Sequence, residues 1–211
     1  TWAPVLCITG QVPRAFLGRG RGHLHELSDQ LGVLRSLTKW CARIERAADA
    51  PEIINEAFRQ MLSGRRGPVA VEMAWDVMAA SGAVELLSAA KIPVSPAPSP
   101  QEVEAAAKLV VAARHPIIMT GSGAQDAAEA IRALSEEIDA PVAAFRGGRG
   151  VTSEDEHLGI SSYAAYKLWP DTDLAIGIGS RVEMPTMRWT GMMTIHDRLA
   201  DPRKLVRIDV D

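Results

Sequence analysis

Three apolar runs in the second half of the chain each end in a turn that contains glycine. Residues 115–123 read HPIIMTGSG, residues 141–150 read PVAAFRGGRG, and residues 174–181 read LAIGIGSR. A continuous apolar run is typical of a parallel strand that is buried on both faces, and a glycine turn at its carboxyl end leaves room for a ligand. The pattern therefore predicts an open α/β sheet with one ligand-binding edge.

Helical periodicity separates these runs. Residues 124–139 have apolar residues at every third or fourth position, which predicts a helix that begins at the first glycine turn and points its free N–H groups at a ligand there. The capping box SPQE at residues 99–102 predicts the start of an earlier helix that continues to residue 113. We also expect a short helix over 163–169 and a strand over 205–210. Alternating helices and strands at this spacing predict a doubly wound parallel sheet.

The first part of the chain has a shorter pattern. The apolar run at residues 4–9 predicts a buried strand, residues 50–62 predict a helix with Pro51 in its first turn, and residues 68–73 predict a second strand. Between the first strand and the helix we expect a long loop that contains alternating glycine and arginine residues. This part is therefore expected to be a partial α/β domain with the order strand, long loop, helix, strand.

The organisation of the chain follows from a change in composition. Residues 79–99 are rich in alanine and serine and end in PVSPAPSP, which predicts a stiff, extended linker. We therefore expect a partial domain at 1–78, a linker at 79–99 and a second domain at 100–211. The chain opens on Thr1 without a start methionine and closes inside an expected strand, which leads us to expect that both ends are cut.

Composition excludes several classes of function. The 211 residues are 47% hydrophobic and 23% charged, as in an ordinary globular protein, and the formal charge of −3 gives no electrostatic case for binding nucleic acid or an anionic membrane. No apolar run is long enough to span a membrane. Cys7 and Cys41 lack metal-ligand spacing and are interpreted as reduced cysteines of a cytoplasmic protein.

The glycine turns are the first candidate site. Gly121-Ser122-Gly123 lacks the third glycine of a dinucleotide fingerprint, and the next strand ends in Phe145 and Arg146 rather than in an acid. Either the glycines only permit tight turns, or they leave room for a nucleotide whose phosphates Arg181 grips. The candidate cofactor-binding residues, which include Asp209 as an acceptor for ribose hydroxyls or as a structural residue, are Gly121, Ser122, Gly123, Gly148, Gly150, Gly179, Ser180, Arg181 and Asp209.

The second candidate site is the pair His25 and Glu26. A histidine next to a carboxylate can move protons near neutral pH, although a histidine in a loop is often only solvated. The sequence has no paired cysteine and histidine cluster for a metal, no nucleophile elbow and no Walker-type lysine. From these residues alone, the chain is an α/β module of a nucleotide-binding kind.

A family resemblance extends this interpretation. The stretches ITGQVP, HELSDQLGVLRSLTKW and SGRRGPVAVEMAWDV resemble the latter half of the pyrimidine-binding domain of thiamine-diphosphate enzymes, and acetolactate synthases look closest. The stretches PIIMTGSGA, IDAPVAAFRGGRG, EDEHLGISS, DTDLAIGIGSR and VRIDVD resemble the Rossmann-like central domain of the same family. The resemblance covers nearly the whole chain in the family's order.

The resemblance implies an enzyme that acts on 2-oxo acids as a transferase or lyase, by carboligation or decarboxylation, with thiamine diphosphate and Mg²⁺ in the full-length protein. It also implies that the glutamate that activates the cofactor precedes residue 1, and that the Mg²⁺ and diphosphate segment follows residue 211. The fragment alone is therefore expected to be inactive. The family forms homo-oligomers, so a dimer or tetramer is expected.

The resemblance also suggests roles for the two candidate sites. His25 and Glu26 lie where family members carry Phe-Gln-Glu or a pair of histidines facing the substrate, which favours His25 as a proton donor. The glycine turns and Arg181 match positions where some members bind FAD or ADP and others have no nucleotide. A thioester lyase of the same family and a stand-alone FAD- or ADP-binding module without thiamine chemistry are the alternatives.

Overall fold

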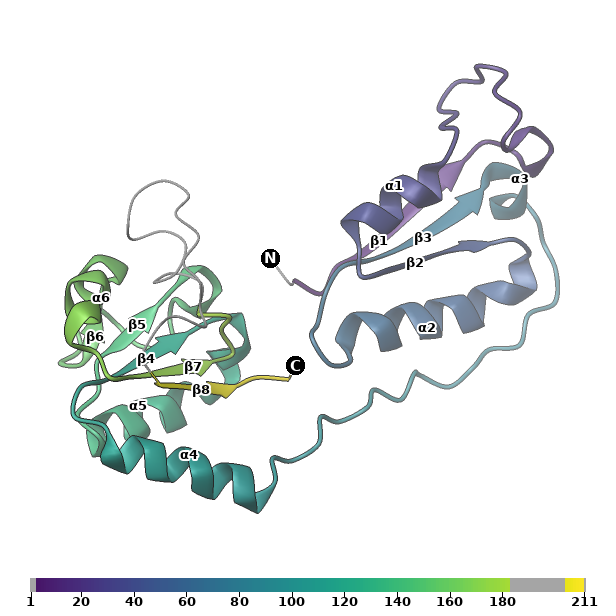
Figure 1. Ribbon diagram of the computed structural model, residues 1–211. Helices are drawn as coiled ribbons and strands as arrows, with labels where there is room; N and C mark the ends of the chain where they lie inside the picture. The colour runs from purple at the N-terminus through teal and green to yellow at the C-terminus, as the bar shows by residue number, and fades with distance from the viewer. Residues whose placement is uncertain (1–2, 183–203, 211) are drawn as a thin grey trace. The chain divides into compact units, whose positions relative to one another are not determined.

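The computed structural model describes residues 3–182 and 204–210, so that Asp211 at the end of VRIDVD lies outside the described residues (Figure 1). The chain divides into two compact units, one that ends at Pro96 and one that comprises Ala97–Val210. Both are built on parallel sheets with flanking helices, which confirms the α/β class. None of the helices in these described ranges has the length and apolar character needed to cross a bilayer.

The first unit is a three-stranded parallel sheet in the order β1-β3-β2. Its strands are Leu6–Gln11 (β1), Trp40–Ile44 (β2) and Val69–Ala74 (β3). Helix α2 (Ala50–Leu62) packs its buried residues against the face that carries Val69 and Val71. Side chains alternate between faces along a strand, and Cys41 on the other face places its Sγ 3.6 Å from the carbonyl of Leu31 in helix α1 (Gln30–Leu37). The two helices therefore cover opposite faces of this sheet.

Two expectations for the first unit were wrong. The long loop contains helix α1 and strand β2, which we did not predict. Gly32 lowers the helical propensity of α1, and the charged Arg43 is the fourth of the five residues of β2, so neither element shows a clean apolar period. Strand β1 was expected to be buried, but the side chain of Ile8 is 63% exposed. The expected helix at 50–62 is confirmed as α2.

The second unit contains a five-stranded parallel sheet in the order β6-β5-β4-β7-β8. The strands are Pro116–Thr120 (β4), Val142–Ala144 (β5), Gly159–Ile160 (β6), Leu174–Ile178 (β7) and Lys204–Ile208 (β8). The helices are Pro100–Ala112 (α4), Ala128–Glu137 (α5) and Ser162–Leu168 (α6), and α4 begins at the predicted capping box on Ser99. The shorter helical turns of the two units are Arg14–Phe16, Ala47–Asp49, Trp75–Met78, Ser122–Ala127, Arg146–Gly148 and Trp169–Asp171.

Helices cover both faces of this second sheet. The residues of β4 alternate, with Ile118 in a core shared with α4 and α5 and Ile117 in a core shared with α6. The chain runs outward from β4 to β5 and β6, and then returns to β7 and β8 on the other side. The strand order therefore reverses between β4 and β7, and ligands of open α/β sheets bind at the carboxyl ends of such neighbouring strands.

One expectation for the second unit needs correction. The helix predicted from residue 124 begins as a 3₁₀ turn over Ser122–Ala127, and regular α5 starts only at Ala128. The tight backbone contact between the turn after β4 and Gly179 draws the chain into this narrower form before the helix can begin. The first N–H groups of α5 therefore lie beyond this six-residue segment, rather than at Gly121.

Candidate functional site

The first candidate site is the loop that joins β1 to α1 at the carboxyl end of β1. Gly18, Gly20 and Gly22 adopt left-handed backbone conformations with φ of 69°, 59° and 72°, which side chains disfavour. At the start of the loop, Arg14 donates from its backbone N–H and its Nε to the carboxylate of Asp76, at 2.9 and 2.8 Å. The glycines therefore fold the loop back on itself, and the ion pair anchors one end of it.

Glu26 organises this loop. Its carboxylate accepts hydrogen bonds from the backbone N–H groups of His23 and Gly20, each at 3.0 Å. These bonds, led by the one from His23, hold the pKa of Glu26 below its ordinary value. The carboxylate is thus ionised and committed to backbone donors, which makes it a positioning group in this loop.

His25 and His23 differ in their surroundings. His25 is exposed and has a positive φ of 67°, so its backbone is held in an unfavourable conformation with its ring at the surface. His23 stacks on Phe16 with 4.2 Å between ring centroids, and its buried Nε2 has no hydrogen-bond partner within the described part of the chain. Sequence reasoning singled out His25 and missed His23, whose partial burial depends on the folded loop.

We expect acid to loosen this loop. The pKa of Glu26 is lower in the folded loop than the ordinary glutamate value of 4.5. Glu26 therefore contributes its full stabilisation of the loop at pH values above this ordinary value, and the contribution is lost as the pH falls through the lower folded pKa. Glu26→Gln should speed amide hydrogen exchange at Gly20 and His23 several-fold at pH 6, and the wild-type rates should approach those of the variant in acid. Glu52→Gln, on an exposed residue of α2, is the matched control. Unchanged exchange at Gly20 would show that Glu26 does not organise the loop.

A polar cavity of about 240 Å³ lies under the same loop. Gln11 at the end of β1 and Gln30 at the start of α1 line it, together with Arg43 of β2. Gln30 donates from Nε2 to the carbonyl of Gly10 at 2.9 Å, which ties α1 to the end of β1. Sequence reasoning did not select these residues, since a single polar side chain in a strand or at the start of a helix carries no local signal of its role.

The second candidate site lies where the strand order reverses in the second sheet. Gly121 and Gly123, in the turn after β4, contact Gly179, in the turn after β7, and the Gly123 N–H donates to the Gly179 carbonyl at 3.3 Å. A Cβ on Gly121 would overlap the carbonyl oxygen of Gly179, and one on Gly148 would overlap that of Thr120. The space above these glycines is filled by neighbouring backbone, so their conformation is explained by tight turns.

The remaining candidates of this edge are open to solvent to different degrees. Ser122, Gly150 and Arg181 are exposed, and Gly150 has a φ of 95° with open space where a Cβ would lie. The Ser180 hydroxyl accepts from the Val182 N–H at 3.2 Å. Asp209, which follows β8, accepts from the Val210 N–H at 2.8 Å and lies 3.5 Å from Arg207. The fold thus brings the turns after β4 and β7 together, but Asp209 already has local partners.

The chemistry of this edge suits a phosphate or a ribose. The turns at the carboxyl ends of β4 and β7 carry the hydroxyls of Ser122 and Ser180 and the cation of Arg181. Below them, Thr120 is fully buried, and its Oγ1 has no hydrogen-bond partner among the described residues. For a metal ion, the described residues contain no cluster of three or more histidine, cysteine or acidic side chains.

Comparison with known proteins assigns a family to this fold. The sequence model described as "Thiamine pyrophosphate enzyme, central domain" matches residues 103–211, more than half of the chain. The chain belongs to the thiamine pyrophosphate enzyme family. The matched segment includes all the strands of the five-stranded sheet and the glycine turns between them.

Similar proteins match the first unit as well as this central domain. A probable 2-ketoarginine decarboxylase of Pseudomonas aeruginosa is 32% identical over 99% of this chain and 37% of its own length. A glyoxylate carboligase of Escherichia coli O157:H7 is 30% identical over 99% of the chain and 35% of its length. The acetolactate synthase isozyme 1 large subunit of Escherichia coli K12 is 26% identical over 99% of the chain and 37% of its own length. The chain thus spans little more than a third of the length of these relatives.

Proposed function

We propose that this chain is part of a thiamine-diphosphate-dependent enzyme that decarboxylates or ligates small 2-oxo acids. The observation that carries the proposal is the match of relatives along 99% of the chain, through both units. A stand-alone FAD- or ADP-binding module would account for the second unit but not for the first. The proposal assigns residues 1–78 to part of a pyrimidine-binding domain, 79–99 to a linker and 100–211 to the central domain.

Thiamine diphosphate would supply a thiazolium carbon that stabilises the carbanion formed from a 2-oxo acid. The described chain contributes the loop after β1 to this chemistry. Glu26 holds the loop by two backbone hydrogen bonds, His25 presents an exposed imidazole that can donate a proton, and His23 is fixed on Phe16. The loop thus offers a positioned proton donor, and Glu26 acts through the backbone and not on the substrate.

We further propose that the central domain holds a nucleotide, FAD or ADP, at the edge where β4 and β7 end. The exposed Ser122 and Arg181 support phosphate binding, and the reversal of strand order supports this location. The protein is proposed to be a cytoplasmic homo-oligomer with Mg²⁺ as the partner of the cofactor diphosphate. Both cysteines are free, which agrees with a reducing compartment.

The test is turnover of 2-oxo acids by the complete gene product. Consumption of pyruvate, glyoxylate or 2-ketoarginine should require both thiamine diphosphate and Mg²⁺, and the isolated 211-residue chain should show none. His25→Ala should lower kcat about 10²-fold or more, as expected for loss of a general acid, while Glu52→Ala leaves it unchanged. Binding of FAD or ADP without any thiamine-dependent turnover would instead favour the stand-alone nucleotide module.

A further inference from the structure

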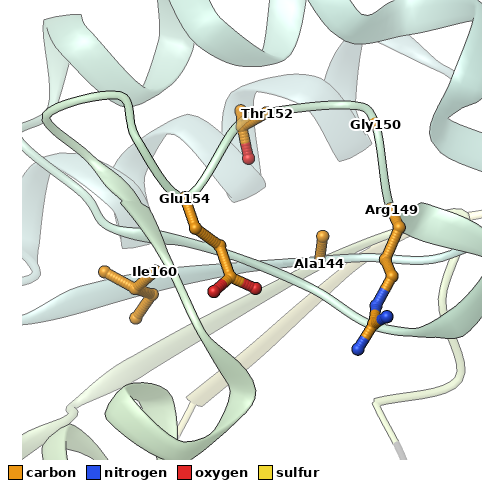
Figure 2. A pocket seen from close by; sticks show the side chains of 6 residues that line it. All are labelled: Ala144, Arg149, Gly150, Thr152, Glu154 and Ile160. Carbon is orange, nitrogen blue, oxygen red and sulfur yellow. The ribbon is translucent and has the colours of Figure 1, made fainter.

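A cavity of about 410 Å³ at the carboxyl ends of β5 and β6 belongs to the second candidate site. It shares Gly150 with the glycine edge, and Figure 2 shows Arg149 and Glu154 extending toward it from one loop. Neither of these charged side chains has a hydrogen-bond partner among the described residues, so neither is held in one position. The loop after β1 in the first unit, in contrast, is fixed by side-chain bonds, and Arg14 makes most of those at its start.

Arg14 connects the segments that follow all three strands of the first sheet. It lies in the 3₁₀ turn Arg14–Phe16, which comes shortly after β1. Its backbone N–H and its Nε donate to Oδ1 and Oδ2 of Asp76, which lies in the helical turn directly after β3. Its Nη1 donates to the carbonyl of Glu45, the residue after β2, at 3.1 Å. One residue therefore holds together the carboxyl ends of β1, β2 and β3.

These bonds need the shape of a guanidinium as well as its charge. Its planar fork lets Nε serve a carboxylate while Nη1 serves a carbonyl on another segment, whereas a lysine has a single nitrogen for both. The backbone hydrogen bond from Arg14, followed by the side-chain bond, holds the pKa of Asp76 below its ordinary value. The carboxylate is therefore ionised at neutral pH, and the network is intact there.

The turn that carries Arg14 also carries Phe16, which links it to the rest of the loop. The Phe16 ring stacks on His23 with 4.2 Å between the ring centroids. The backbone N–H of His23 donates to the carboxylate of Glu26, the residue next to His25, at 3.0 Å. Because a 3₁₀ turn is short and tightly wound, a shift of Arg14 also shifts Phe16. A continuous set of contacts thus runs from the strand ends to the residue beside the candidate proton donor.

We propose that Arg14 is a positioning residue, which sets the place of the His25 imidazole through this set of contacts. The inference rests on the proposed function, in which His25 donates a proton to the reacting substrate. Because its Nε and Nη1 donate to acceptors of the protein, Arg14 acts through the loop and not on the substrate. A displacement of a reacting group by about 1 Å can lower turnover by about 10²-fold, so a partial loss of this positioning is measurable.

The experiment is a double-mutant cycle on kcat of the complete thiamine-dependent enzyme. Arg14→Ala should lower kcat about tenfold with little change in KM, and Arg14→Lys should recover part of the loss. When His25→Ala is already present, Arg14→Ala should lower kcat by less than about twofold, because the donor that it positions is gone. Arg46→Ala, which breaks the exposed pair of Arg46 and Asp49 within one turn, is the matched control and should leave kcat unchanged in both backgrounds.

Amide hydrogen exchange at His23 gives a second readout that does not depend on turnover. Exchange should be several-fold faster in Arg14→Ala than in the wild type or in Arg46→Ala, because the contact through Phe16 is loosened. Circular dichroism verifies that each variant is folded, and Arg14→Lys replaces Arg14→Ala in the cycle if the latter unfolds.

Two results would overturn the proposal. One is an equal loss of kcat from the Arg14 substitution with and without His25, which would show that Arg14 supports the fold and not the proton donor. The other is unchanged exchange at His23, which would show that Arg14 is not coupled to the rest of the loop. If exchange responds but the complete wild-type protein has no thiamine-dependent turnover, the proposed function fails and the coupling of Arg14 to the loop is retained.

Discussion

Gly179→Ala is expected to destabilise the central domain by about 2–4 kcal/mol, because it combines backbone strain with a steric overlap. Gly179 has a φ of 54°, and a Cβ there would overlap the backbone carbon of Gly123 in the neighbouring turn. The two turns follow β4 and β7, which are paired neighbours where the strand order reverses, so neither turn can move away without disturbing the sheet. Thermal unfolding of the central domain should shift down by roughly 10 °C or more.

Gly150→Ala is the matched control for this substitution. Gly150 also has a positive φ, of 95°, but no atom lies within 4 Å of its added Cβ. The Gly150→Ala substitution should therefore cost only the backbone strain of a side chain at positive φ, about 1 kcal/mol of stability. If Gly179→Ala costs no more than Gly150→Ala, the contact between the turns is not tight, and the glycines of this edge regain their interpretation as space left for a ligand.

The sequence predicts the central domain well and the first unit less well, for a physical reason. Strands β4 and β7 are runs of buried, mainly apolar residues that lie between helices. Their burial on both faces of the sheet can therefore be inferred from the sequence of each strand alone. Strand β2 reads WCARI, and its arginine, Arg43, pairs with Glu72 of β3, which is 29 positions away. Such a long-range pair leaves no local period in the sequence.

The candidate sites show the same limit. Sequence patterns placed the glycines at the carboxyl ends of the strands, yet only coordinates show that Gly121 and Gly123 are covered by the backbone at Gly179. They also show that Glu26 is committed to backbone N–H groups, while the neighbouring His23 carries the buried ring nitrogen. A motif identifies residue types that can perform a chemistry, whereas partners far along the chain decide which of them remain available for it.

Arg43→Met is expected to destabilise the first unit by about 3–5 kcal/mol, since it leaves a buried carboxylate without its counter-charge. Glu72 of β3 is completely buried, and Arg43 Nε donates to its Oε1. The second carboxylate oxygen, Oε2, is buried and has no hydrogen-bond partner among the described residues. No nearby donor in this part of the structure can therefore replace the arginine. The measurement is the free energy of unfolding from urea denaturation.

Glu72→Met, the substitution of the other partner, should destabilise the first unit less. The Arg43 side chain is 23% exposed and also lies 3.6 Å from Glu45, so it keeps water and a carboxylate when Glu72 is lost. Replacing both partners by methionine should recover most of the stability, because no unpaired charge then remains buried. Arg46→Met, at the exposed pair with Asp49, is the control and should have little effect. If the double variant is as unstable as Arg43→Met alone, the loss comes from packing of the arginine stem and not from the stranded charge.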